Sequence, residues 1–126
     1  MKFTRTFILL GLLLTGCGSH DAKLSQQILG TWTKGPFSWT EPPLYSKTFA
    51  ADGSFTTSIG HTNALVIYQG TWLVKDGELV MTTTNAHGTG NHQPGPWGGV
   101  DRVKIIRVDE RQLDLEFSNQ LFTLSR

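Results

Sequence analysis

Cysteine is almost absent from this chain of 126 residues, and its single copy, Cys17, lies near the N-terminus. One cysteine excludes a disulfide within the chain, so the fold must be stabilised by a hydrophobic core. Long apolar runs are also missing. Residues 7–14 are apolar except for Gly11, but a helix needs about 20 such residues to cross a bilayer. This run is too short for a membrane span and fits the core of a signal peptide.

Neither sign of charge is in large excess. The chain has 11 basic and 10 acidic residues, and without Lys2 and Arg5 nine basic residues stand against ten acidic ones. No block of basic residues remains, although such a block is the usual footprint of a nucleic-acid-binding surface. We therefore expect no nucleic-acid partner.

Sequence motifs of common enzymes are missing as well. The chain has no Gly-x-Ser-x-Gly nucleophile motif and no glycine-rich phosphate loop before a helix. Asp52 and Asp76 are each followed by glycine, which is typical of tight turns and not of a paired acid and base. We expect no enzymatic activity and no cofactor.

The first residues have the organisation of a bacterial export signal. Lys2 and Arg5 precede the short apolar run, which ends in Leu-Thr-Gly-Cys at positions 14–17. This ending resembles the lipobox of bacterial lipoproteins. The resemblance implies that residues 1–16 are removed and that Cys17 carries fatty acyl chains such as palmitate, and two or more chains suffice for stable membrane anchoring. The alternative is an ordinary secreted protein in which the cysteine occurs by chance.

The residues after Cys17 bear on the final location and on the domain boundary. Inner-membrane lipoproteins usually have aspartate directly after the lipidated cysteine, whereas this chain has Gly18. The resemblance therefore implies the outer membrane, with the protein facing the periplasm. We expect a lipidated cysteine and tether over residues 17–23, and one domain over residues 24–126.

A short helix is predicted over residues 21–28, with Asp21 as its N-cap and Leu24 and Ile28 on one face. After this helix the pattern changes to strands, because β-branched and aromatic residues alternate with polar ones between closely spaced turn signals. The predicted strands are 29–34, 45–50, 54–59, 64–74, 78–84, 100–108, 112–117 and 120–125.

Four hairpin turns are predicted between these strands. Asp-Gly pairs at 52–53 and 76–77 favour tight turns, because glycine accepts a positive φ angle. Residues 109–111 and 118–119 are the other two. Eight short strands joined in this way describe an all-β, up-and-down antiparallel barrel, and the alternative is a two-layer β-sandwich. Lys47 interrupts an otherwise apolar alternation, and we expect it at a sheet edge.

One tripeptide occurs twice, as Gly30-Thr31-Trp32 and as Gly70-Thr71-Trp72. Glycine allows two backbones to approach closely, and a tryptophan two residues later points to the same face. We interpret Gly30, Trp32, Gly70 and Trp72 as structural residues that begin or continue a strand and fill the barrel.

These motifs and their surroundings resemble the small bacterial lipocalin-like domains. The resemblance lies in residues 29–32 after a short helix, in 49–55, in 68–72 and in 76–79, and it extends over most of residues 24–125. It implies a calycin-type barrel of about eight strands. It also implies that the connection between the first two strands covers the open end of the barrel.

The barrel interior is expected to be largely filled. An eight-stranded barrel is either just filled by its own side chains or holds one small ligand. The residues expected to point inward are bulky, which favours packing with at most a shallow cup at one mouth. They are Trp32, Phe49, Phe55, Ile59, Trp72, Leu115, Phe117 and Leu124.

Two long loops are the candidate sites of function. The loop over residues 35–44 contains Phe37 and Trp39, which suit either a lid with a contact surface or an apolar cap that folds back over the barrel. The loop over residues 85–99 has five glycines and no periodicity, and loops of this length are often functional. It contains His87, His92 and Trp97.

A metal site is a weaker hypothesis for the same loops. His87 and His92, together with His61, supply imidazole groups that zinc or copper could use. Solvated loop histidines are far more common, and no fourth ligand at a typical spacing is present. We expect no bound metal.

Two functions from different classes remain open. In the first, the barrel binds a small apolar or amphipathic molecule at its mouth, with Phe37, Trp39, His61, His87, His92 and Trp97 as contact residues. In the second, the barrel is filled and its loops bind another envelope protein, for example as an inhibitor. The sequence alone does not decide between them.

Overall fold

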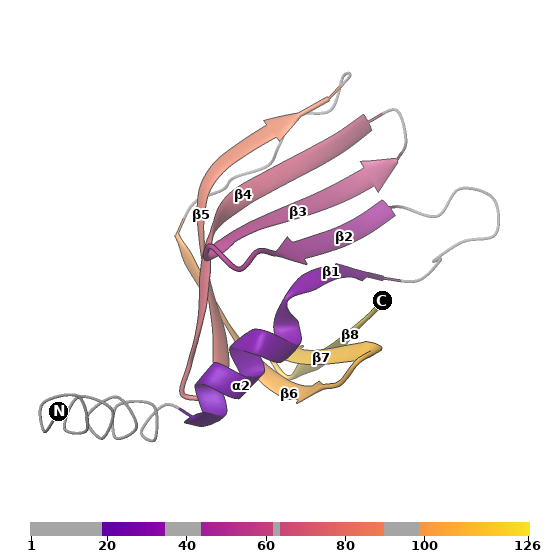
Figure 1. The fold of residues 1–126 in the computed structure, drawn as a ribbon. Helices are drawn as coiled ribbons and strands as arrows, with labels where there is room; N and C mark the ends of the chain where they lie inside the picture. The colour runs from indigo at the N-terminus through magenta and orange to yellow at the C-terminus, as the bar shows by residue number, and fades with distance from the viewer. Residues whose placement is uncertain (1–18, 35–43, 62–63, 90–98) are drawn as a thin grey trace, which may run out of the picture.

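The computed structural model of the protein describes residues 19–34, 44–61, 64–89 and 99–126 (Figure 1). Helix α2 is followed by eight antiparallel strands, each hydrogen-bonded to the next, and β8 pairs with β1 so that the sheet closes into a barrel. The elements are α2 (Ser19–Ile28), β1 (Gly30–Thr33), β2 (Leu44–Phe49), β3 (Ser54–His61), β4 (Ala64–Lys75), β5 (Glu78–Gly88), β6 (Val100–Val108), β7 (Gln112–Phe117) and β8 (Gln120–Ser125). In the described ranges no helix is long and apolar enough to cross a membrane.

The closed barrel confirms the predicted fold class and excludes the sandwich. All eight predicted strands are present, and their ends differ from the prediction by a few residues. The two ends of the barrel differ. At the closed end lie helix α2 and the turns β2–β3, β4–β5 and β6–β7, whereas β1, β3, β5 and β7 finish at the open end.

Strand β5 corrects one prediction about the second long loop. Residues 85–88 were expected in that loop, but they continue β5 and pair with β4 as far as Val66. The sequence did not reveal this because the strand contains a β-bulge. Gly70 pairs with Thr83 while Gln69 pairs with Asn85, so Thr84 is an extra residue that shifts the alternation by one.

The hairpin turns have the backbone conformations that their residues favour. Asp76 and Gly77 have φ angles of 54° and 75°, and Ser118 and Asn119 have 50° and 63°. Two successive positive φ angles define the turn type that matches the twist of a two-residue hairpin. Asp52 accepts hydrogen bonds from the backbone N–H and the hydroxyl of Ser54, at 2.9 and 2.6 Å. Within the described residues, Asp52 and Asp76 therefore act in turns.

The hydrophobic core fills the closed half of the barrel. Its largest fully buried side chains are Trp32, Phe49, Ile28, Leu79, Leu113 and Leu124. Ile28 belongs to α2, which packs against β4 and β6 and closes this end of the barrel (Figure 1). Ile59 and Phe117 follow the inward alternation of their strands, as expected, but they are not buried. These two side chains are 38% and 55% exposed, because they lie where β3 and β7 reach the open end.

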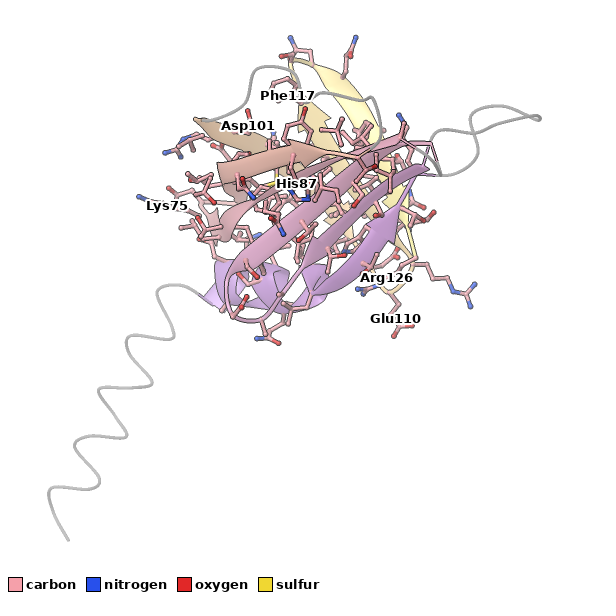
Figure 2. The ribbon with its side chains drawn as sticks, turned by 90° about the horizontal axis from the view of Figure 1, so that it is seen from above. Lys75, His87, Asp101, Glu110, Phe117 and Arg126 are labelled. Carbon is pink, nitrogen blue, oxygen red and sulfur yellow. The ribbon has the colours of Figure 1, made fainter. Side chains whose placement is uncertain are left out.

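Trp32 holds the helix, the first strand and the C-terminus together. Its indole N–H donates a hydrogen bond of 2.7 Å to the carbonyl oxygen of Ile28. The guanidinium of Arg126 lies 4.0 Å above its ring centre and donates to the carbonyl oxygen of Leu29 at 2.6 Å. Arg126 also donates to the carbonyl oxygen of Glu110 at 2.8 Å, and Figure 2 shows these two residues together near the helix.

Gly70, in the second copy of the repeated tripeptide, is required by a close approach of two strands. A Cβ atom at this position would collide with the backbone carbonyl oxygen of Thr82 and would lie 2.9 Å from the ring of Phe55. Trp72, two residues later, packs edge-to-face on Phe49 with ring centres 5.2 Å apart and donates a hydrogen bond to the carbonyl oxygen of Ala50. This copy of the motif is therefore part of the packed scaffold.

Asp21 fastens the start of α2 to the barrel. It was expected to cap the helix, but the helix begins at Ser19 and the carboxylate accepts hydrogen bonds from the backbone N–H groups of Asp76 and Gly77, at 2.9 and 3.0 Å. These two hydrogen bonds favour the ionised carboxylate and hold the pKa of Asp21 below its usual value of 3.8.

Asp21→Asn should lower the free energy of unfolding at neutral pH. The asparagine amide has one acceptor oxygen, whereas the backbone N–H groups of Asp76 and Gly77 each donate to a different carboxylate oxygen of Asp21. The folded-state pKa of Asp21 is depressed, so its stabilising contribution is present above pH 3.8 and is lost as the pH falls through the folded-state pKa. Urea unfolding at several pH values measures the free energy of unfolding of both proteins. The difference between wild type and variant should become smaller as the pH falls into the acidic range. Gln26→Ala, an exposed change on the same helix, serves as the control. A difference that is constant with pH would contradict this role.

Candidate binding cavity

The residues expected to form the functional site are not brought together in the described part of the chain. Cys17, Phe37, Trp39, His92 and Trp97 lie outside the described residues. His61 ends β3 and pairs with Ala64, and His87 lies in β5, where it pairs with Ile67. These two histidines are therefore on different strands with β4 between them.

His87 is exposed and points away from the barrel interior. The extra residue at Thr84 shifts the alternation, so that Ala86 shares the inward face with Tyr68 and His87 shares the outward face with Ile67. Within the ranges that the structure describes, no three histidine, cysteine, aspartate or glutamate side chains gather where they could hold a metal ion.

A cavity of about 330 Å³ lies along the inner side of β2 and of β5 to β8 and opens to solvent. The volume exceeds that of one water molecule, about 30 Å³ in the liquid, roughly tenfold. It lies at the lower end of the range of small-molecule sites, about 300–1,000 Å³. The barrel is therefore filled at its closed end and leaves this one cavity open towards the other end, among the described residues. The lining residues are Lys34, Tyr45, Lys47, Met81, Val103, Leu115, Phe117, Gln120, Leu121 and Phe122.

The wall of the cavity changes from buried to exposed apolar side chains. Met81, Val103 and Leu115 are at most 7% exposed and form its inner part. Phe117 and Leu121, which flank the β7–β8 turn, are 55% and 62% exposed. Such an apolar path from the interior to solvent is suited to an apolar chain.

Lys47 brings a positive charge into this cavity, and its expected place at a sheet edge is wrong. Strand β2 lies between β1 and β3, and Lys47 pairs with Trp32 on one side and with Thr57 on the other. Cross-strand partners share a face, so Lys47 points inward with Trp32 and is only 9% exposed. The same alternation that directs Tyr45 and Phe49 inward directs Lys47 inward.

The Lys47 ammonium is poorly compensated. Its single hydrogen-bond contact within the described residues is the sulfur of Met81, a weak acceptor, at 3.4 Å, and the ring centre of Phe55 lies 5.7 Å away. Burial lowers the pKa of Lys47 from 10.5 to about 8, while the negative charge of Asp101 acts in the opposite direction. Asp101 pairs with Met81 at the start of β6 and is exposed at the open end (Figure 2).

A second polar group beside Lys47 is unsatisfied. Thr57 is 4% exposed, and its hydroxyl oxygen has no hydrogen-bond partner among the described residues. A buried hydroxyl without a partner costs about 1–3 kcal/mol, so such groups are uncommon in native proteins. Because Thr57 is the cross-strand partner of Lys47, an under-compensated donor and an unsatisfied hydroxyl lie side by side.

Tyr45 and Phe122 form another side of the cavity. Their rings meet edge-to-face with centres 5.4 Å apart, and the Lys34 ammonium lies 4.1 Å from the centre of the Phe122 ring. Burial raises the pKa of Tyr45 to about 12, so its hydroxyl is neutral at physiological pH.

A wider hollow of about 410 Å³ lies near the β6–β7 turn and is a weaker candidate. Two of its charged groups already pair with each other. Arg107 and Asp109 form an ion pair of 2.7 Å, and Asp109 accepts backbone hydrogen bonds from Arg111 and Gln112, which holds its pKa at about 2. No buried polar group in this hollow lacks a partner within the described residues.

Comparison with models of known protein families finds none that matches this chain, and comparison with curated proteins finds no similar sequence. The barrel is consistent with a calycin-like fold.

Proposed function

We propose that the protein is a membrane-anchored barrel that binds one small amphipathic molecule in the cavity at its open end. The observation that carries this proposal is the unfilled cavity of about 330 Å³, with apolar walls and a buried lysine inside. Binding sites for small molecules combine such walls with a few placed polar groups.

Native mass spectrometry of the protein isolated from its host tests the binding proposal. We expect a bound species of low mass that is released on unfolding, and a rise in melting temperature when amphiphiles are added back, because a ligand that binds only the folded state stabilises it. A folded protein that carries no bound species and shows no thermal shift across a panel of amphiphiles would contradict the proposal.

The anchoring part of the proposal rests on the lipobox-like residues 14–17 and has its own test. Wild-type protein should incorporate a labelled fatty acid and sediment with membranes, because two or more acyl chains give stable anchoring. Cys17→Ser should lose the label and appear in the soluble fraction. Ser19→Ala, two residues further on, is the matched control. A Cys17→Ser protein that remains on the membrane would argue against anchoring through this residue.

A second candidate function is docking of another envelope protein at the open end. Apolar side chains of Val100, Phe117 and Leu121 are each more than half exposed there, and exposed apolar groups in one region often mark an interaction surface. Cross-linking in the envelope with wild type and with a Phe117→Ser, Leu121→Ser double variant tests this function. Partners captured equally by both proteins would count against this surface.

A further inference from the structure

Lys47 has the properties of a binding site for an anionic group inside the barrel, and Thr57 is its buried cross-strand neighbour but does not itself line the cavity. Lys47 is 9% exposed and Thr57 is 4% exposed, so neither can rely on water for full solvation. The ammonium has only the Met81 sulfur as a hydrogen-bond acceptor, and the Thr57 hydroxyl has no partner, within the described residues. Both groups can donate a hydrogen bond, and both are on the inward face at the same level of the barrel.

We propose that the cavity selects amphiphiles with a carboxylate head and holds that head at Lys47 Nζ, with the apolar chain directed to the open end. This inference rests on the proposed binding function. A carboxylate accepts hydrogen bonds from an ammonium group, and it supplies the negative charge that the buried ammonium lacks.

The charges around the cavity favour a single negative charge on the head. Asp101 adds a carboxylate near Lys47 from the open end, so a second charge on the ligand would meet repulsion. Lys34 also lines the cavity, and its ammonium is placed over the Phe122 ring. A monoanionic carboxylate therefore fits these surroundings better than a phosphate monoester, which carries close to two charges.

The apolar residues give the orientation and the size of the ligand. Lys47 and Met81 are buried, whereas Phe117 and Leu121 are more than half exposed, so the head lies inside and the chain leads outward. A cavity of about 330 Å³ has room for about ten water-sized groups. This corresponds to a fatty acid of medium length.

Calorimetric titration with decanoate and with decanol distinguishes the contribution of the head group to the affinity from that of the apolar chain. Both ligands are used below the concentrations at which they aggregate. We expect the wild-type protein to bind decanoate at least about tenfold more tightly than decanol. In Lys47→Met, which keeps an apolar chain of similar length, this preference should disappear. Equal affinities of wild type for the two ligands, or a preference that persists in Lys47→Met, would overturn the carboxylate site and leave the binding function intact. Binding of neither ligand would overturn both.

A further variant tests a neighbour of Lys47. Asp101→Asn should strengthen decanoate binding and leave decanol unaffected, because only the anion is repelled by Asp101. A decanoate affinity that is the same in Asp101→Asn as in wild type would contradict the placement of the head.

The pH profile gives a test that needs no variant. Titratable groups on the inward face near Lys47 are Lys34, Tyr45, Tyr68 and Asp101. The affinity for decanoate should fall as the pH rises through about 8, where Lys47 loses its proton, while the affinity for decanol should be level. A decanoate affinity that is constant across this range would contradict a role for the Lys47 charge.

Discussion

Trp32→Ala should lower the free energy of unfolding by about 3–5 kcal/mol, the usual cost of deleting a large aromatic side chain from a core. Trp32 is fully buried and fills the closed half of the barrel. The substitution also removes the hydrogen bond to the carbonyl oxygen of Ile28 and the surface on which the Arg126 guanidinium stacks. The helix, the first strand and the C-terminal residue would therefore loosen together.

Denaturant unfolding followed by circular dichroism measures this loss. Trp32→Phe should cost less than Trp32→Ala because it keeps most of the buried apolar volume. Leu73→Ala removes an apolar side chain that is 52% exposed on the outer face, and it should change stability by less than about 1 kcal/mol. If Trp32→Ala were as mild as Leu73→Ala, the packing described for the closed end would be wrong.

Lys47→Met should have the opposite effect and raise the free energy of unfolding by about 1–3 kcal/mol at neutral pH. Burial disfavours the charged ammonium, and apolar residues that replace buried charges often stabilise a protein by amounts of this size. The folded-state pKa, about 8, lies below the value of 10.5 in an ordinary environment. Between these two values the unfolded chain binds the proton and the folded chain does not, so wild-type stability rises with pH there.

The difference in free energy of unfolding between Lys47→Met and wild type should therefore be largest below about pH 8. It should become smaller as the pH approaches 10.5. Chemical unfolding of both proteins across this pH range measures the difference. The other lysines contribute equally to both proteins, so their titration does not affect it. Tyr45, with a pKa of about 12, stays neutral throughout. If Lys47→Met proved less stable than wild type at neutral pH, Lys47 would have to be solvated or paired in the folded protein. A gain in stability together with a loss of decanoate binding would show that the lysine is kept for its ligand.

Features determined by neighbouring residues could be predicted from the sequence. The strands follow from the alternation of β-branched and aromatic residues with polar ones, and the turns follow from pairs such as Asp76-Gly77 and Ser118-Asn119, which adopt positive φ angles. When each strand pairs with the next one in the sequence, the sheet has the strand order of the observed closed barrel. The large buried residues Trp32, Phe49 and Leu124 were predicted because each fits the alternation of its strand.

Features that depend on three-dimensional proximity could not be predicted in this way. The extra residue Thr84 reverses the facing of His87, and nothing in a run of threonines marks its position. Arg126 stacks on Trp32 from the opposite end of the sequence, and Asp21 bonds to a turn more than fifty residues away. Such contacts become visible only when the strands are assembled.

Lys47 is a different case, because the signal was present in the sequence. Its position in the alternation with Tyr45 and Phe49 places it on the inward face, but a charge on that face argued for a sheet edge. The structure shows that the periodicity was the better guide and that the charge marks the cavity. A charged residue that fits an inward alternation is therefore a useful indicator of a binding site.

The attachment of Asp21 to the β4–β5 turn has a consequence for how the protein would stand on a membrane. Only Gly18 separates Cys17 from the first residue of α2, and each residue spans at most about 3.6 Å. An acyl anchor on Cys17 would therefore hold the closed end of the barrel near the lipid headgroups. The helix lies on the side opposite Asp101 and Phe117 (Figure 2), so the opening would face away from the bilayer. A ligand would then enter from the aqueous compartment and not directly from the leaflet that carries the protein.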